Sequence, residues 1–222
     1  MKSEIISSWE KNAKEWVEVI QNQSIPSRKF TNRAILESIS NLKVKKVADL
    51  GCGEGWLTRE MAQLGIETTG FDAIKSLLVE ASKKGPETYH QLTFEDIING
   101  LEIPEAPFDA AIFNFCLYLK DNLRLLLENT LSNLVPMGHV LIQTLHPFFL
   151  IQNGFRYESQ WLSDSWKGLP GNFKDGHSWY ARTFEDWVNL LSALEDIAFE
   201  ISEIKNDEEK PISLIIKIRK LK

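Results

Sequence analysis

The chain has 222 residues, 43% of them hydrophobic and 25% charged, which suits a globular protein with room for one α/β domain. The net charge of −6 argues against a nucleic-acid partner, since such partners usually select a basic surface. No apolar run reaches membrane-spanning length and residues 1–10 lack the apolar core of a signal peptide, so we expect no membrane association and a cytoplasmic location.

Two amphipathic helices are predicted before the first strand. In residues 3–22, Trp9 and Trp16 share the apolar face, and a second helix is predicted over residues 28–39. We expect residues 1–43 to form a helical lid over one end of the domain. The two tryptophans are favoured as packing residues over substrate contacts.

From residue 44, strand-like and helix-like segments alternate along the chain. Predicted strands cover residues 44–50, 66–72, 88–93, 108–115 and 139–144, and predicted helices cover residues 56–64, 73–84 and 122–134, with a turn at 136–138. The fourth strand is almost continuously apolar, as expected of a strand buried on both faces. This alternation predicts a parallel sheet with helices on both faces.

The alternation ends after the fifth strand. Residues 145–182 are rich in aromatic side chains and contain several glycines, and so long an excursion from regular structure is usually functional. A helix with Thr183 as its cap is predicted over residues 183–198. The last two predicted strands, 199–204 and 212–219, are joined by a short polar turn and must therefore pair antiparallel.

A glycine-rich loop follows the first predicted strand, with the sequence Asp49-Leu50-Gly51-Cys52-Gly53-Glu54-Gly55. Glycine permits a sharp turn from strand into helix, and it lets a ligand lie against the backbone near the free N–H groups of a helix N-terminus. By itself such a loop could be an ordinary turn between a strand and a helix. Its interpretation therefore depends on the residues that follow the neighbouring strands.

Three further positions should meet the loop at one edge of the sheet, because ligands of an open parallel sheet bind beyond the carboxyl ends of its strands. Asp72 ends the second strand, where a carboxylate can accept hydrogen bonds from both ribose hydroxyls. Phe94 and Glu95 follow the third strand, within reach of an adenine, and Asn114 ends the fourth. Asp72 or Glu95 alone could simply start a helix. The order and spacing of all four positions predict a site for a nucleoside cofactor.

The residue after the loop separates two classes of cofactor. A dinucleotide fingerprint requires glycine where this chain has Trp56, and a bulky side chain hinders the close packing of helix and strand. The chain also lacks a Tyr-x-x-x-Lys pair near the site, so a nicotinamide-dependent oxidoreductase is the disfavoured alternative. The loop instead resembles the acid-x-G-x-G-x-G loop of class I S-adenosylmethionine-dependent methyltransferases. Residues 134–139 are similar to the leucine-x-proline-glycine-glycine turn of that family, with His139 in place of its second glycine.

The resemblance covers about residues 44–220 and implies a doubly wound, Rossmann-like α/β fold. Its sheet would be mostly parallel, with seven strands in the order 3-2-1-4-5-7-6 and the last-numbered strand antiparallel. Residues 1–222 would then form a single domain. Within it, residues 44–144 would be the cofactor-binding half, 145–182 a cap or substrate insertion after strand five, and 183–222 the closing helix and antiparallel strand pair.

The resemblance also implies S-adenosyl-L-methionine as cofactor, S-adenosyl-L-homocysteine as product, and a set of cofactor-binding residues: Arg28, Asp49, Gly51, Cys52, Gly53, Asp72, Ala73, Phe94, Glu95 and Asn114. Residues 51–53 would pass along the methionine part and the ribose. Asp49 would orient the loop or, through water, the amino group of the cofactor. Arg28 would pair with the cofactor carboxylate, although a solvated surface arginine is an equally good interpretation.

The remaining implied contacts follow the strands outward from the loop. Asp72 would hold the ribose hydroxyls, and Ala73 would lie beside the adenine. Phe94 and Glu95 would frame the edge of the adenine, and Asn114 would approach the methionine amino group.

The acceptor is expected to be a small molecule bound between the N-terminal helices and residues 145–182. A general base is optional in methyl transfer, because the cofactor carries the reactive group and the protein mainly aligns it. His146, just past the fifth strand, is the best candidate base by position, and His177 is the second. Either histidine could instead be a packing residue.

Two negative observations narrow the prediction. The fourth strand continues Asn114-Phe115-Cys116-Leu117, which is not the asparagine/aspartate-proline-proline-aromatic motif of enzymes that methylate exocyclic amines. The only two cysteines, Cys52 and Cys116, lack metal-ligand spacing, so no metal site is predicted. A non-catalytic module that binds S-adenosylmethionine remains the alternative to an enzyme.

Overall fold

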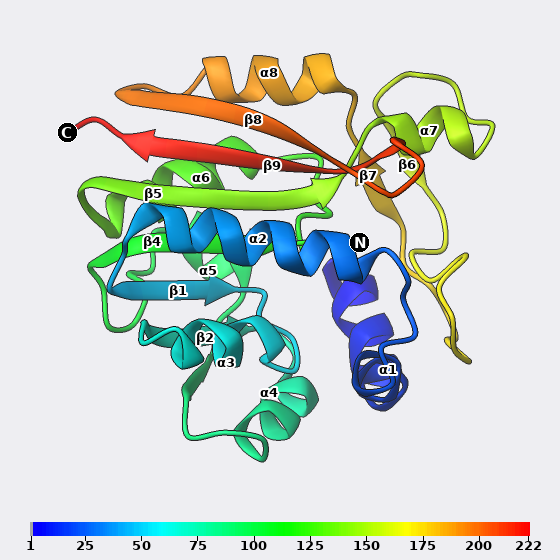
Figure 1. Ribbon diagram of the computed structural model, residues 1–222, viewed down its shortest axis with the longest axis horizontal. Helices are drawn as coiled ribbons and strands as arrows, with labels where there is room; N and C mark the ends of the chain where they lie inside the picture. The colour runs from blue at the N-terminus through cyan, green and yellow to red at the C-terminus, as the bar shows by residue number, and fades with distance from the viewer. Residues whose placement is uncertain (1) are drawn as a thin grey trace.

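The computed structural model of the protein describes residues 2–222. A seven-stranded sheet runs through it in the order β3-β2-β1-β4-β5-β9-β8 (Figure 1). Its strands are β1 Lys46–Leu50, β2 Glu67–Asp72, β3 Thr88–Gln91, β4 Phe108–Asn114, β5 Leu134–Leu145, β8 Ile197–Lys205 and β9 Pro211–Lys220. Neighbouring strands from β3 to β5 are parallel, whereas β9 is antiparallel to both β5 and β8. Counting the strands of this sheet alone gives 3-2-1-4-5-7-6, so the predicted fold class is confirmed.

Helices pack on both faces of the sheet. One face carries α2 (Arg28–Leu42) and α3 (Trp56–Gln63), and the other carries α5 (Phe94–Ile98), α6 (Leu123–Ser132) and α8 (Phe184–Ser192). The N-cap of α8 is Thr183, as predicted, since its side chain accepts a hydrogen bond from Asp186 N. These layers leave the carboxyl ends of the parallel strands at one edge of the domain.

Strand β4 is the centre of the core. Ala110 and Ile112 pack toward α2 and α3, whereas Ala111 and Phe113 pack toward α5 and α6, and all four side chains are fully buried. Because successive side chains of a strand point to opposite faces, a strand covered on both sides must be apolar throughout. The strand ends at Asn114, and this change to a polar side chain marks the edge where the site lies.

The predicted turn at Pro136-Met137-Gly138 is wrong as a boundary, because these residues lie inside β5. Leu134 already pairs with Phe108, and the pairing resumes at His139 opposite Ala110, so the extra residues form an irregularity in a continuous strand. Met137 has φ 65, which shows that the local turn geometry persists within the strand. A second difference is the short helix α5, which the sequence indicated only as a helix start at Glu95.

Residues 145–182 contain more regular structure than an unstructured loop. They form the short helix α7 (Phe148–Gln152) and two short antiparallel strands, β6 (Gln160–Leu162) and β7 (Trp179–Ala181). The stretch of this segment near residue 170, drawn in yellow in Figure 1, lies beside α1 (Lys2–Gln21), to which Lys174 and Asp175 are hydrogen-bonded. The first and last thirds of the chain therefore meet at the edge where the parallel strands end.

Candidate active site

The glycine loop after β1 has the geometry that its sequence predicted. Gly51, Gly53 and Gly55 have φ values of 77°, 58° and 79°, in the left-handed region that side chains with a Cβ rarely adopt. The Gly51 and Cys52 N–H groups both donate to Phe71 O, at 2.7 and 3.0 Å, which fixes the loop to β2. The loop is therefore a rigid, close-packed turn.

Asp72 joins this loop to the end of β2. Its buried carboxylate accepts hydrogen bonds from Gly53 N and from Ile74 N, both at 2.8 Å. Burial raises the pKa of Asp72 to about 6, against the lowering effect of these backbone N–H groups. The carboxylate thus lies beside the loop at the strand edge, where a ribose contact was predicted, and that contact stays a prediction.

Asp49 points into the protein. Its side chain is buried and accepts a hydrogen bond from Thr58 Oγ1 at 2.7 Å, which ties the end of β1 to the first turn of α3. Burial raises the pKa of Asp49 to about 7, and the neighbouring charge of Asp72 adds to the rise. These contacts fit the predicted role of Asp49 in orienting the loop.

Phe94 and Glu95 begin α5, which is held by a capping box between Thr93 and Asp96. The Phe94 ring packs edge-on against Phe113, with centroids 5.5 Å apart. Its Cζ lies 3.4 Å from the point that a Cβ on Gly51 would occupy. An aromatic ring therefore borders the glycine loop on the side predicted for the adenine.

Buried polar atoms without partners gather where β4 and β5 end. Asn114 Oδ1, Gln143 Oε1 and Arg28 Nη2 are buried and have no hydrogen-bond partner among the described residues. Asn114 and Gln143 are paired in register on β4 and β5, and Gln143 Nε2 donates to Thr31 O of α2 at 3.0 Å. Arg28 lies one helical turn earlier on α2, which brings a cationic donor and two acceptor oxygens to the same end of the sheet.

The partly buried position of Arg28, with its Nη2 fully buried, favours the functional interpretation over a solvated arginine. Its guanidinium packs over the Trp56 ring at 4.6 Å from the centroid. Burial lowers the pKa of Arg28 to about 10, partly offset by the charge of Glu54, so the group stays cationic at pH 7. Trp56, which separates this loop from a dinucleotide fingerprint, thus supports an arginine.

Helix α1 closes over this edge. Trp16 Nε1 lies 3.8 Å from the point that a Cβ on Gly53 would occupy. The helix also packs on Ala73 and on α4 (Lys75–Ser82), where Glu10 accepts from Lys75 N at 3.0 Å and Ser76 Oγ at 2.6 Å. Ala73 therefore lies under α1, and residues 1–43 include the helix that covers the loop.

An aromatic cluster lies between α1, the loop after β4 and residues 166–177, and it consists of Trp9, Trp16, Tyr118, Trp166, Phe173 and His177. Ring centroids of Trp9 and Trp166 are 4.6 Å apart, and those of Tyr118 and His177 are 4.8 Å apart. Phe115, just after β4, has φ 53, a conformation that costs a residue with a side chain on the order of 1–3 kcal/mol. That strained turn leads the chain from the strand edge toward Tyr118.

The two candidate bases differ in their hydrogen bonds. Phe148 N donates to His146 Nδ1 at 3.0 Å, so His146 Nε2 carries the proton and donates to Glu203 Oε1 at 2.7 Å. With both ring nitrogens engaged, His146 has no lone pair to accept a substrate proton, and these contacts do not favour the predicted catalytic role. His177 is fully buried and its Nε2 has no partner among the described residues.

Gln143 is the residue that the sequence analysis missed. Its signal is a polar residue that follows the apolar run Val140-Leu141-Ile142, directly before the strand leaves the core. The same change from apolar to polar identified Asn114 at the end of β4. Applying it to every predicted strand would have selected Gln143 as well.

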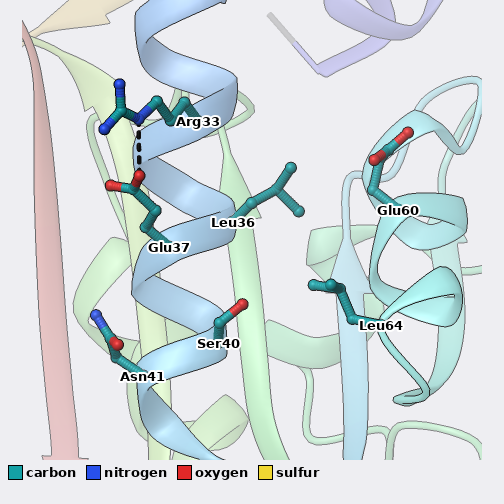
Figure 2. A pocket seen from close by; sticks show the side chains of 7 residues that line it. All are labelled: Arg33, Leu36, Glu37, Ser40, Asn41, Glu60 and Leu64. Carbon is teal, nitrogen blue, oxygen red and sulfur yellow. Dashed lines mark hydrogen bonds and ion pairs between the residues drawn. The ribbon is translucent and has the colours of Figure 1, made fainter.

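A surface groove of about 600 Å³ lies away from these residues, between α2 and α3 near the amino ends of β1 and β2. Figure 2 shows Leu36 of α2 pointing toward Leu64 after α3, and Arg33 paired with Glu37 on α2. None of its lining residues belongs to the predicted site. Over residues 2–222, no helix is both long and apolar enough to span a bilayer, and no group of three or more His, Cys, Asp or Glu side chains is placed to hold a metal ion.

Comparison with known proteins finds methyltransferases, the class of protein that the sequence resembles. Residues 22–195 match a methyltransferase domain family. A demethylmenaquinone methyltransferase of Tropheryma whipplei is 22% identical over 172 residues, which cover 77% of this chain and 70% of that protein. Among solved structures, the DhpI-SAM-HEP complex has a TM-score of 0.69 at 20% identity over 97% of both chains. The plantazolicin methyltransferase BamL, solved with a triazolic desmethylPZN analog and SAH, has a TM-score of 0.68 at 15% identity over 99% of this chain and 96% of that one.

The chain belongs to the methyltransferase domain family, and the fold is that of its class I, S-adenosylmethionine-dependent members. The predicted family, enzyme class and cofactor are confirmed. The residues at the strand edge fit that cofactor, because a cationic donor and two acceptor oxygens are buried there without partners among the described residues, beside a loop whose three glycines have positive φ.

Proposed function

We propose that the protein transfers a methyl group from S-adenosyl-L-methionine to a small-molecule acceptor by in-line displacement. The observation that carries this proposal is the pair of buried, unpartnered groups Arg28 Nη2 and Asn114 Oδ1. A guanidinium and an amide oxygen are complementary to the carboxylate and the ammonium of an amino acid. Gln143 Oε1, unpartnered at the same edge, is a second acceptor for that ammonium.

The other predicted residues have matching places along the same edge. Asp72 can exchange the hydrogen bond from Gly53 N for bonds from two ribose hydroxyls, while Ile74 N still holds its other oxygen. Phe94 and Glu95 border the adenine, and the backbone at residues 51–53 lies against the sugar and the methionine chain. Residues 1–43 act as the lid, and residues 145–182 provide the acceptor side.

When bound, the cofactor supplies a sulfonium methyl group that a nucleophile can attack. The protein's share of the catalysis is alignment of the nucleophile with that methyl group, which contributes up to about 7–11 kcal/mol in favourable cases. The aromatic cluster provides a surrounding of low polarity, and Tyr118 and Trp16 exclude water from the edge of the sheet. The Tropheryma relative is named for a quinone precursor and BamL for plantazolicin, which supports an acceptor other than a nucleic acid.

Arg28→Ala tests the cofactor site. The variant leaves the ligand carboxylate without its cation, so we expect S-adenosylhomocysteine to bind about 10- to 100-fold more weakly, the cost of about 1.5–3 kcal/mol for a charged hydrogen bond. Isothermal titration measures this, with Arg33→Ala as matched control because Arg33 lies on the same helix in an exposed pair with Glu37. Equal affinity of the two variants, or binding of NAD by the wild-type protein, would contradict the assignment. A protein that binds S-adenosylhomocysteine but methylates nothing would favour the non-catalytic alternative.

A further inference from the structure

We propose that His177 is the general base of the methyl-transfer reaction, and that the acceptor is a planar molecule whose nucleophile, a hydroxyl or an amine, still carries a proton when it binds. This inference rests on the function proposed above and specifies its substrate class. It depends on the hydrogen bonds of His177, on its place beside the reacting edge and on the groups around it.

The hydrogen bonds of His177 fix which nitrogen is free. Nδ1 lies 3.0 Å from Ser178 O, and because a carbonyl oxygen only accepts, Nδ1 must carry the proton. Nε2 then holds a lone pair, and it is buried without a partner among the described residues. Leaving a buried polar atom unpaired costs about 1–3 kcal/mol, so such an atom requires an explanation. A role as general base explains the unpaired Nε2, because its lone pair can accept a proton from a bound substrate.

The position of His177 places it next to the reacting end of the site. Its ring packs against Tyr118, with centroids 4.8 Å apart, in the loop that leaves β4 after Asn114. Cys116 of the same loop donates through Sγ to Leu50 O at 3.2 Å, so the loop also touches the glycine turn. The loop that follows Asn114 therefore contacts both His177 and the glycine turn.

Burial keeps His177 neutral, although a carboxylate lies near it. Glu4 approaches from α1, Tyr118 from the loop after β4 and Asp164 from the turn beside Gly176. Burial lowers the pKa of His177, with smaller raising effects from Ser178 O and from Glu4, so the ring is unprotonated at pH 7 and able to accept a proton. Trp166, edge-on at 6.1 Å between ring centroids, and Tyr118 give His177 aromatic surroundings, which favour a flat acceptor.

The proposed step balances without any further reagent. The acceptor O–H or N–H bond breaks, and its proton moves to His177 Nε2. The lone pair of that acceptor atom forms the bond to the methyl carbon, and the bond from methyl carbon to sulfur breaks with its electron pair kept by sulfur. The imidazolium later releases the proton to water, which restores the neutral ring.

The first experiment reads the protonation of His177 without turnover. The chain has four histidines, so ¹⁵N-histidine NMR gives four assignable pairs of signals, with His177→Gln identifying the relevant one. We expect a neutral ring with the proton on Nδ1 at pH 7, and a shift of the Nε2 signal when phenol is added to the complex with S-adenosylhomocysteine. An imidazolium, a proton on Nε2, or an Nε2 signal that phenol does not move would overturn the proposal.

The second experiment measures transfer of label from methyl-labelled cofactor to a panel of planar phenols, aromatic amines and aromatic carboxylates. We expect phenols or amines to be methylated, and His177→Gln to lower kcat at pH 7 by about 10²–10⁴-fold with unchanged affinity for S-adenosylhomocysteine. The variant rate should then rise tenfold per pH unit, as the acceptor loses its proton to solvent. His139→Gln, in the middle of β5 and paired with Ala110 and Arg219, is the matched control and should behave as the wild type.

Two results of the second experiment would reject the base. These are a His177→Gln rate within threefold of the wild type at pH 7, and methylation of carboxylates alone, which need no base. A loss of kcat accompanied by an equal loss of cofactor affinity would assign His177 a structural role and also reject it. Failure of the wild-type protein to bind S-adenosylhomocysteine would instead contradict the proposed function, while the protonation and tautomer of His177 are still read by NMR in the ligand-free protein.

Discussion

At the scale of single residues, Gly51 and Gly65 share a backbone conformation but differ in the space available for a side chain. Gly51 and Gly65 have φ values of 77° and 79°. A Cβ on Gly51 would lie 2.7 Å from Cys116 Cβ and 2.8 Å from its Sγ, whereas a Cβ on Gly65 would meet nothing within 4 Å. A side chain at position 51 is opposed by the backbone conformation and by a steric clash, whereas a side chain at position 65 is opposed by the backbone conformation alone.

We therefore expect Gly51→Ala to destabilise the protein more than Gly65→Ala. The conformational cost of about 1–2 kcal/mol applies to both variants, and the contact with Cys116 adds about 1–3 kcal/mol at Gly51 alone. Urea unfolding monitored by tryptophan fluorescence measures both free energies. Equal losses would show that the loop moves away from Cys116 without cost, and would weaken the description of the turn as rigid.

The sequence identified site residues that are recognised by their position at the end of a strand. It was least informative for residues whose role depends on their hydrogen-bond partners. Asp72 and Asn114 were selected because they end predicted strands, and the structure places both at the expected edge. For His146 and His177, position alone favoured His146. The two histidines differ in their hydrogen bonds. Glu203, which accepts from His146 Nε2, is 57 residues away in the sequence, and the Phe148 N–H that donates to His146 Nδ1 depends on the turn after β5, so the sequence reveals neither contact.

At the scale of elements, the N-terminal helix is held from two sides. Glu10 joins α1 to the start of α4, and Asn12 joins it to the chain after Phe173. The buried Asn12 side chain donates to Lys174 O at 2.7 Å and accepts from Lys174 N at 2.8 Å. Because Trp16 of the same helix lies over Gly53, the helix must move for a ligand to leave the glycine loop.

Asn12→Ala should loosen this closure. It removes both hydrogen bonds between α1 and Lys174, worth about 1 kcal/mol each, so S-adenosylhomocysteine should dissociate about 5- to 30-fold faster. Stopped-flow tryptophan fluorescence measures the rate, and hydrogen exchange of the α1 amides reports on the helix itself. Lys14→Ala, at an exposed position of the same helix, is the control. An unchanged dissociation rate in Asn12→Ala would mean that α1 does not control exit.

Helices and strands were predicted correctly where the spacing of apolar residues is regular enough to identify them. The alternation from residue 44 predicted a parallel sheet with helices on both faces, whereas the order of its strands came from the resemblance to the methyltransferase family. The turn at 136–138 was separated from β5 because proline and glycine normally interrupt strands, yet pairing of Leu134 with Phe108 overrides that preference. Strands β6 and β7 have three residues each, too few for a period to be recognised.

At the scale of the whole molecule, the candidate site lies at the edge of the sheet where two acidic side chains are buried. Asp49 and Asp72 are both buried, and each raises the pKa of other groups at the edge, including Cys52 and Cys116. Arg28 lies at the same edge. A bound cationic sulfonium would enter this negatively biased surrounding, so ligand binding and the protonation of the acids are linked.

This arrangement predicts how stability changes with pH. The folded pKa of Asp49, about 7, lies above its ordinary value of 3.8, so between these values the folded state binds a proton that the unfolded chain has lost. The stabilising contribution is therefore complete below about pH 4 and is lost as the pH rises through 7. Each pH unit in this interval corresponds to about 1.4 kcal/mol, which gives on the order of 2–3 kcal/mol between pH 5 and pH 8.

Asp49→Asn removes this dependence while its amide oxygen still accepts the Thr58 hydroxyl. The free energy of unfolding in urea, measured without ligand at pH 5 and pH 8, should fall less for the variant than for the wild type, by on the order of 2–3 kcal/mol. All other carboxylates are common to both proteins and cancel in this difference. A difference of zero would mean that Asp49 is already ionised in the folded protein at pH 5, in which case the carboxylate, and not the acid, orients α3 against the glycine loop.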